Sequence, residues 1–420
     1  MSEHFDRLET RDPQEREAAL MAALPAQIAH AQATAAFARI LKGVDPRDIA
    51  SRAALARLPV TRKHELVEHQ REARALGGDP FGGYALLGWR GVSAPRTARR
   101  VFQSPGPLYE PEGALSDYWR VARAIFAAGF RAGDLLHNSF SYHLTPAGSM
   151  METGAHALGC AVFAGGVGNT ELQLQAMRDL RPTGYTGTPS FLKILLEKAA
   201  ESDAKLSLAR ALVSGEALPA SLREQFRSQG IEAFQCYATA DLGLIAYETA
   251  AREGLVLDEG VIVEIVRPGT GDPVEPGEVG EVVVTTLNAD YPLVRFGTGD
   301  LSAVLGGHCP TGRTAPRIKG WMGRADQTTK VRGMFVHPAQ VADILKRAPQ
   351  ALRARLVVSG RTGADVMTLR VEAASPPPDL ADTLVQALRD VTKLRGEVEF
   401  VAPGSLPSDG KVIEDIRSLD

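Results

Sequence analysis

The chain has 420 residues, of which 44% are hydrophobic, and its 47 basic and 50 acidic side chains leave a net charge of −3. This length predicts two or three domains, because a single hydrophobic core rarely grows beyond about 250–300 residues. A charge so close to zero gives no general attraction to nucleic acid or to an anionic membrane surface. We therefore expect small-molecule partners, with no nucleic acid and no membrane.

The three cysteines, Cys160, Cys236 and Cys309, are too few, and odd in number, for a disulfide framework. The first residues are charged and lack the apolar stretch of a secretion signal, and no segment has the roughly 20 apolar residues of a membrane span. These features predict a soluble protein of the reducing cytoplasm. The oligomeric state stays open, with a homodimer as one option.

Residues 1–80 are predicted to form an N-terminal helical segment of a large domain, because apolar residues recur there at helical spacing. From 81 to 323, helices and short strands alternate. They begin with a helix over 115–129 and the strand LLHNSF (135–140), and continue through AVFAG, TELQLQAMRDL, GYTG, PSFLKILLEKAA, ARALVSG, PASLREQF and IEAFQCYA. This alternation predicts βαβ units in a parallel, doubly wound α/β sheet, with ligands beyond the carboxyl ends of its strands.

Two further regions have a different character. Residues 260–305 contain the apolar runs VIVEIVRP, EVGEVVVTTL and PLVRF with Gly and Pro between them, which predicts a small antiparallel β subdomain within 81–323. Residues 327–420 are predicted as strand, helix, strand, strand, helix and strand, and Leu380, Leu384 and Leu388 share one face of the second helix. This is the split βαβ order, so we expect a separate small α+β domain.

Glycine-flanked polar clusters follow several of these strands, and each places an acid, a base or a hydroxyl beside a flexible backbone. They are VSGEALP (213–219), CYATADLG (236–243), VRFGTGD (294–300), GRADQTTKVRG (323–333) and LPSDGK (406–411). In this order, and with the phrase AAGFRAGDLLHN, they resemble the phenylacetate-CoA ligase family of the adenylate-forming acyl-CoA synthetases. The resemblance runs from about Leu115 to the end of the chain.

The resemblance implies an AMP-forming ligase. Such an enzyme activates a small carboxylic acid, of the aromatic class in this family, with ATP and Mg²⁺, releases pyrophosphate, and then transfers the acyl group from AMP to coenzyme A. The small C-terminal domain of the family swings about a hinge between the two steps. The expected partners are therefore the acid, ATP and coenzyme A.

The large domain carries residues that match the family's nucleotide site. Asp300 matches the acid that accepts hydrogen bonds from the ribose hydroxyls, and Tyr237 matches the aromatic residue that flanks adenine. Ser214, Gly215 and Glu216 match the strand end along which adenine lies, where a missing side chain lets backbone groups approach the base.

The motif after Tyr237 departs from the family pattern. Ala240 stands where the hydroxyl that binds the α-phosphate is expected, although Thr239 is adjacent. Asp241 matches the Mg²⁺ ligand, as an oxygen donor on a shorter stem than the usual glutamate.

The C-terminal domain supplies a second set of candidates. Asp326 matches the hinge residue and Arg324 lies beside it, where a few positions must allow backbone rotation. Arg332 and Gly333 match the segment that faces the active site in the thioester-forming orientation. Lys411 matches the lysine that stabilises charge on the carboxylate and the α-phosphate during adenylation.

His143 matches a residue that borders the acyl pocket, for which Phe140, Tyr142 and Phe163 are further candidates. Taken alone, these residues also have ordinary explanations: a strand-end histidine for His143, a turn or cap for Asp300, a core tyrosine for Tyr237 and a solvated lysine for Lys411. Some relatives carry a Cys/His zinc site, but only His308 and Cys309 fall in the matching segments. Two adjacent ligands cannot close a tetrahedral site, so we expect no structural zinc.

The family's glycine- and threonine-rich loop, whose amides, hydroxyls and lysine hold the β- and γ-phosphates, has no full match. It is placed either at GVSAPRTAR (91–99) or at QSPGPLYEPEG (103–113). In the first placement Arg96, Thr97, Arg99 and Arg100 can supply charge and a hydroxyl. Two hypotheses follow: an active ligase that has rebuilt its phosphate grip with arginines, or a non-adenylating member that binds an acid, a nucleotide or a CoA thioester without releasing pyrophosphate.

Overall fold

The computed structural model describes residues 3–202, 204–267, 270–322, 324–325, 329–332, 334–336, 338–348, 350–361, 364–407 and 411–417. The chain divides into two compact units, Met1–Met322 and Gly323–Asp420, each with its own hydrophobic core. The N-terminal helices and the β subdomain both belong to the larger unit. Within the described ranges, no helix combines the length and the apolar character needed to cross a bilayer.

A nine-stranded sheet runs through the larger unit in the order β16-β17-β12-β11-β10-β9-β8-β6-β7. Its parallel half contains β6 (Leu135–Asn138), β7 (Ala161–Ala164), β8 (Gly184–Gly187), β9 (Arg210–Val213) and β10 (Glu232–Thr239). Its antiparallel half contains β11 (Gly243–Glu248), β12 (Leu255–Leu257), β16 (Val304–Leu305) and β17 (Arg317–Ile318). The chain goes from β6 out to β7 and then back past β6 to β8, and a reversal of this kind creates a ligand crevice at the carboxyl ends of the strands.

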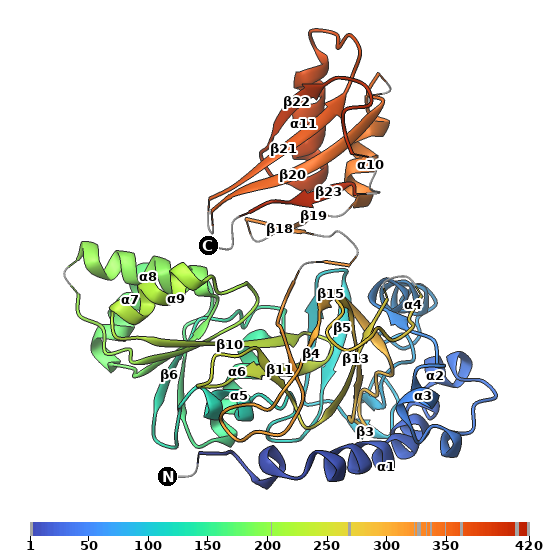
Figure 1. The fold of residues 1–420 in the computed structure, drawn as a ribbon, viewed down its shortest axis with the longest axis vertical. Helices are drawn as coiled ribbons and strands as arrows, with labels where there is room; N and C mark the ends of the chain where they lie inside the picture. Colours follow the sequence, from blue (N-terminus) through green and yellow to red (C-terminus); the bar gives the residue numbers. More distant parts are fainter. Residues whose placement is uncertain are drawn as a thin grey trace. The chain divides into compact units, whose positions relative to one another are not determined.

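Helices cover both faces of the parallel half of this sheet (Figure 1). One face packs against α7 (Thr170–Leu180), α8 (Pro189–Glu201) and α9 (Ala220–Ser228), and the other against α5 (Ala122–Ala127) and α6 (Ala147–Ala157). In α8 the buried Leu192, Leu195 and Ala199 follow the helical period, so they form one stripe against the sheet. The predicted doubly wound α/β class is confirmed.

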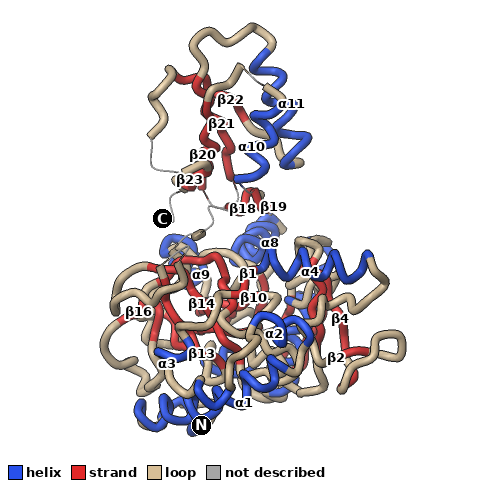
Figure 2. Tube along the Cα trace, turned by 90° about the vertical axis from the view of Figure 1, so that its right-hand side faces the viewer, coloured by secondary structure: helices blue, strands red, loops and turns tan. Residues whose placement is uncertain are grey.

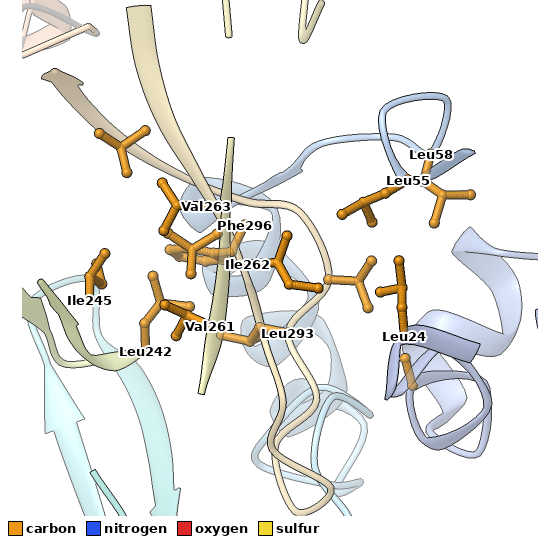
Figure 3. Close-up of a cluster of buried hydrophobic side chains, with 14 of the residues drawn as sticks. Leu24, Leu55, Leu58, Leu242, Ile245, Val261, Ile262, Val263, Leu293 and Phe296 are labelled. Carbon is orange, nitrogen blue, oxygen red and sulfur yellow. The ribbon is translucent and has the colours of Figure 1, made fainter. Parts of the chain in front are cut away.

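The β subdomain is a four-stranded sheet in the order β1-β15-β14-β13. Its strands are β1 (Thr61–Arg62), β13 (Val261–Val266), β14 (Gly280–Thr286) and β15 (Phe296–Ser302). It shares a core with the helices α1 (Pro13–Gln32), α2 (Ala35–Ile40) and α3 (Arg52–Leu55), and the short 3₁₀ helices η1 (Arg7–Thr10) and η2 (Pro46–Asp48) flank them. Figure 3 shows Leu24 and Leu55 of these helices in one cluster with Val263 and Phe296 of the sheet.

A helix and two pairs of strands complete the larger unit. Helix α4 (Lys63–Ala75) follows β1 directly, and its start is fixed because the Arg62 amide donates to the Glu65 carboxylate at 2.8 Å. Strands β2 (Leu87–Gly88) and β3 (Arg96–Thr97) pair in parallel. Strands β4 (Arg100–Ser104) and β5 (Leu108–Glu112) form an antiparallel hairpin.

The smaller unit contains a four-stranded sheet in the order β22-β21-β20-β23, with both of its helices on one face (Figure 2). The strands are β20 (Arg353–Arg361), β21 (Ala364–Glu372), β22 (Glu397–Val401) and β23 (Ile413–Asp415), and the helices are α10 (Pro338–Lys346) and α11 (Leu380–Thr392). Leu380, Leu384 and Leu388 of α11 are buried in its core, at the spacing that the sequence predicted.

The expected split βαβ arrangement is not adopted in this unit, although its α+β character is retained. β21 pairs directly and in parallel with β22, so no strand separates the two strands that α11 connects. The predicted first strand, KVRGMFV, is divided into β18 (Thr329–Val331) and β19 (Met334–Val336), which pair with each other. The left-handed φ of 47° at Arg332 turns the chain back between them, so the segment forms its own hairpin instead of entering the larger sheet.

Two boundaries in the larger unit also differ from those predicted. The helix expected over 115–129 is confined to α5, because Arg120 has a left-handed φ of 62° and Asp117 accepts hydrogen bonds from the Val121 and Ala122 amides ahead of the helix. The strand expected at PLVRF begins only at Phe296, because Arg295 has a φ of 45°.

Candidate active site

The carboxyl ends of β9 and β10 bring two of the predicted segments, VSGEALP and CYATADLG, to one edge of the sheet. Ser214 follows β9, and its hydroxyl donates to the Cys236 carbonyl of β10 at 2.8 Å. Glu216 accepts from the Ser190 amide at the start of α8, at 3.3 Å. These contacts tie the VSGEALP segment to β10 and to the start of α8, so it is held in place along the rim.

Gly215 is exposed on this rim. Its φ of +79° belongs to the left-handed region, and a Cβ added there would meet nothing nearer than Thr188 Cγ2 at 3.8 Å and Phe140 at 4.0 Å. The backbone conformation therefore explains the glycine, because other residues pay about 1–2 kcal/mol for it. A Cβ at this position would be in ordinary van der Waals contact with both side chains, so Gly215 lies close to Thr188 and Phe140.

Tyr237 and Asp300 meet at the same rim from two different sheets. The Tyr237 hydroxyl donates to Asp300 Oδ2 at 2.8 Å, and the indole nitrogen of Trp321 donates to Asp300 Oδ1 at 3.1 Å. The two donors fix the plane of the carboxylate at the end of VRFGTGD. Thr239, two residues beyond Tyr237, accepts from the Leu242 amide at 3.1 Å, which closes the turn that carries Asp241.

Asp241 lies in a buried polar cluster that the sequence did not predict. Its Oδ2 pairs with the Lys63 ammonium at 3.0 Å, and its Oδ1 is buried without a hydrogen-bond partner among the described residues. Lys63 also donates to the Ser104 hydroxyl at 3.4 Å, and Ser104 donates to Glu110 at 2.5 Å. Burial, together with the negative charge of Asp241, raises the pKa of Glu110 to about 8.

Lys63, Ser104 and Glu110 are therefore additional candidates for the site. No local pattern marks Lys63, which stands 178 positions before Asp241. Ser104 and Glu110 do fall in one of the two predicted placements of the phosphate loop, 103–113. The structure makes this segment the β4–β5 hairpin and brings its turn to the cluster around Asp241.

In the other placement, 91–99, Arg96 is engaged elsewhere. Arg96 pairs with Asp290 at 2.9 Å and donates to the Ala289 carbonyl at 2.6 Å. Arg100, one residue beyond it, pairs with the buried Glu112 at 2.8 Å. These two side chains stabilise the local structure.

The acyl-pocket candidates are split by the structure. Phe140 is buried and lies beside Gly215, whereas His143 is exposed on the loop after β6 and its ring has no hydrogen bond to any described residue. The buried histidine of this region is His137. Its Nε2 donates to Gln173 at 2.7 Å, and its ring stacks on the ring of Phe163. Burial lowers the pKa of His137, which keeps its ring neutral.

The candidates of the smaller unit are described only in part. Arg332 donates from its backbone amide to Asp365 Oδ2 at 2.7 Å and from its guanidinium to the Asp365 carbonyl at 2.8 Å. Arg324 is partly exposed, and Lys411 is exposed just before β23. Asp326 and Gly333 lie outside the described residues.

Within the described ranges, no group of three or more His, Cys, Asp or Glu side chains is arranged to hold a metal. Cys309 instead lies 3.1 Å from the Thr311 hydroxyl. Asp241, whose buried Oδ1 has no hydrogen-bond partner among the described residues, offers a single carboxylate oxygen of the kind that Mg²⁺ binds.

Comparisons with known proteins point to the same part of the chain. A family model described as "AMP-binding enzyme" matches residues 127–288, which include the parallel strands and their carboxyl ends. The fold and the site therefore define an adenylate-forming enzyme of the AMP-binding class.

Curated relatives narrow the class further. A phenylacetate-coenzyme A ligase of Thermus thermophilus is 30% identical over 418 residues and 90% of each chain is covered. One of Aromatoleum evansii is 31% identical over 349 residues, covering 79% of this chain and 75% of the relative. The chain belongs to the phenylacetate-CoA ligase family, and the predicted family and class, an AMP-forming acid–thiol ligase, are confirmed.

Solved structures show the same fold. A 2-hydroxyisobutyryl-CoA ligase in complex with 2-HIB-AMP and CoA, in its thioesterification state, matches with a TM-score of 0.79 at 23% identity, covering 100% of this chain and 93% of that chain. The similarity extends over both units of the present chain.

Proposed function

We propose that this enzyme activates a small aromatic carboxylic acid with ATP to an acyl-adenylate and then transfers the acyl group to coenzyme A. The substrate class rests on the names of the curated relatives, which are phenylacetate-CoA ligases. The observation that carries the proposal is the pairing of Tyr237 with Asp300 at the rim on which Gly215 is exposed.

In this proposal the rim binds the nucleotide. Adenine lies along Ser214, Gly215 and Glu216, with the ring of Tyr237 against it, because a purine stacks well on an aromatic face and a glycine leaves room for it. Asp300 accepts hydrogen bonds from the ribose hydroxyls. Tyr237 and Trp321 orient its carboxylate in advance, which lowers the entropy cost of binding.

The acid lies beyond the α-phosphate, close to Phe140. The buried ring of Phe140 offers an apolar wall to an aromatic acid. Thr239 replaces the missing hydroxyl of the Ala240 position as the nearest side-chain donor to the α-phosphate. We place His143 at the outer edge of this pocket, in keeping with its exposure.

Asp241 is the proposed Mg²⁺ ligand. A buried carboxylate oxygen without a hydrogen-bond donor is costly, and a hard divalent cation satisfies it. When bound, Mg²⁺ neutralises charge on the phosphates of ATP.

The smaller unit is proposed to move between the two half-reactions about Asp326, with Arg324 beside it. Lys411 then stabilises the charge on the carboxylate and the α-phosphate during adenylation. Arg332 and Gly333 serve the thioester-forming step, in which coenzyme A displaces AMP.

Three buried free thiols, Cys160, Cys236 and Cys309, support the assignment of the protein to the reducing cytoplasm.

A second function is favoured by one observation. The segment between β4 and β5 is only a short turn, Pro105–Pro107, and its two prolines remove backbone amides that a phosphate loop uses. A non-adenylating protein that binds the acid, the nucleotide or a CoA thioester would have this turn and yet keep the rim.

Acid-dependent exchange of labelled pyrophosphate into ATP separates the two functions. We expect exchange with at least one acid of a panel of aryl and aliphatic acids in the presence of Mg²⁺. Nucleotide binding without exchange for any acid would establish the second function instead. Binding of neither ATP nor CoA would contradict both.

A further inference from the structure

Lys63 occupies a position between the rim and the hairpin turn. It is the first residue of α4, and its ammonium contacts Asp241 Oδ2 at 3.0 Å and the Ser104 hydroxyl at 3.4 Å. Asp241 follows β10 at the rim, and Ser104 ends β4 immediately before the short turn. A cation at this point lies where the phosphate tail of a nucleotide bound along the rim would extend.

The exposure of this ion pair is one-sided. The Lys63 side chain is 39% exposed, whereas the Asp241 side chain is 3% exposed. The ammonium can therefore be reached from solvent while its carboxylate partner is enclosed. A lysine has a compact charge on a flexible four-carbon stem, so it can turn from one anion to another without backbone movement.

The neighbouring arginines are bound more firmly. Arg62 pairs with Glu281, and Arg100 pairs with Glu112, and each of these carboxylates is only 1% exposed. Releasing either arginine would leave a buried charge uncompensated, which is strongly unfavourable. Asp241 differs, because a divalent cation bound to its unpaired oxygen would compensate the carboxylate when Lys63 departs.

We propose that Lys63 is the phosphate-binding cation of this site, and that its ammonium turns from Asp241 to the β- and γ-phosphates of ATP, or to pyrophosphate. It thereby replaces the lysine that the short turn after Ser104 lacks. This inference rests on the proposed nucleotide site, but it does not require that the acid be activated.

The test measures binding to the full-length protein by calorimetry, with Mg²⁺ and one of three probes: ATP, inorganic pyrophosphate or adenosine. We expect Lys63→Met to weaken ATP and pyrophosphate about 10- to 100-fold, the usual loss for a charge-assisted hydrogen bond, and to leave adenosine within about twofold. Lys63→Arg keeps the charge and restores most of the ATP affinity. Lys42→Met removes an exposed lysine outside the proposed site and is the matched control, with no expected effect.

Lys63→Met leaves the Asp241 carboxylate without its partner. Lys63→Gln is therefore the second variant, because the glutamine amide can still donate to this carboxylate. A complementary measurement labels Lys63 with an amine-specific reagent and quantifies the product by mass spectrometry. Pyrophosphate with Mg²⁺ should protect Lys63 in the wild-type protein, and adenosine should not.

The outcomes separate this inference from the proposed function. If the wild-type protein binds ATP and all Lys63 variants bind it equally well, Lys63 is not the phosphate cation, while the ligase function stands. If ATP binding depends on Lys63 but no acid supports pyrophosphate exchange, the inference stands and the ligase function fails. If ATP binds no more tightly than adenosine, or no probe binds, the inference is overturned.

Discussion

Tyr237 and Asp300 are joined by a 2.8 Å hydrogen bond, although they belong to β10 of the nine-stranded sheet and β15 of the four-stranded sheet. The position of the Asp300 carboxylate therefore depends on how these two sheets pack, and not on one loop. In the proposed site Tyr237 flanks adenine and Asp300 binds the ribose, so this one hydroxyl would couple the two parts of the nucleotide site.

Tyr237→Phe tests this coupling, because it keeps the ring and removes the donor. We expect ATP affinity to fall about tenfold, the loss typical of one hydrogen bond to a charged group, with the adenine stacking retained. Isothermal titration calorimetry with ATP measures the effect. Tyr84→Phe, which loses a hydrogen bond to His69 elsewhere in the fold, should bind ATP like the wild-type protein. Equal affinities for both variants would show that Asp300 needs no support from Tyr237.

Gly215→Ala should have two separable effects. The left-handed φ of +79° should cost about 1–2 kcal/mol of stability, and the added methyl group should occupy the space assigned to adenine and weaken nucleotide binding. Gly230→Ala is a matched control, because Gly230 has a φ of +81° and no atom near the added Cβ. Denaturant unfolding should show similar losses for both variants, and only Gly215→Ala should lose ATP affinity. A loss of affinity in Gly230→Ala would mean that the strain acts indirectly.

Glu110 should make stability depend on pH. Its pKa is raised from 4.5 to about 8, mainly by burial, so between these values the folded chain keeps a proton that the unfolded chain releases. The contribution of this group to stability is fully present below pH 4.5 and is lost as the pH rises to about 8. Glu110→Gln stays neutral, so its free energy of unfolding should rise relative to wild type over this range, by an amount on the order of a few kcal/mol. Parallel pH profiles in chemical denaturation would contradict the raised pKa.

Lys411→Ala should separate the two half-reactions. We expect acid-dependent pyrophosphate exchange to fall at least about 100-fold, since a charge that stabilises the transition state is removed. Thioester formation from synthetic acyl-adenylate and CoA should change little. Lys346→Ala removes another exposed lysine of the same unit and should affect neither step. Equal losses in both steps would assign Lys411 a structural role.

Leu24 should be essential for the packing of the N-terminal helices. It is fully buried in the core that these helices share with the β subdomain (Figure 3), so Leu24→Ala should cost about 2–5 kcal/mol of stability. Leu172→Ala, at a position 65% exposed on α7, should cost little. Thermal unfolding compares the two, and equal midpoints would place Leu24 outside the cooperative core.

The sequence predicts the parts of the fold in which local periodicity and long-range packing agree. The alternation from LLHNSF to IEAFQCYA is found as β6 to β10 with their helices, because each apolar run there is also buried in the sheet. It fails where one residue adopts a left-handed conformation. Arginine is not a residue type that predicts a positive φ, yet Arg120, Arg295 and Arg332 each adopt one and each ends or divides a predicted element.

The site is predicted where its residues stand in local motifs and is missed where contacts form between distant segments. Ser214, Tyr237 and Asp300 stand in recognisable motifs, of which the first follows β9 and the other two lie within β10 and β15. Lys63 has no such motif, and only the folded chain brings it to Asp241. In the sequence, Glu110 is one acid in the run LYEPE. Its pKa is raised because it is buried in the hairpin. The two-residue alternation of a strand does not show which of its two faces is buried, so this burial could not be predicted.

Lys411 stands two positions before strand β23. Ile413 lies in register with Leu356 of β20, so the lysine is anchored two positions before an edge strand. A truncation that stops short of this strand would remove the ammonium and also uncover the hydrogen-bonding edge of β20, which invites association between molecules. Loss of activity on such shortening would combine damage to the sheet with the missing charge, and only a substitution at Lys411 itself isolates the chemistry.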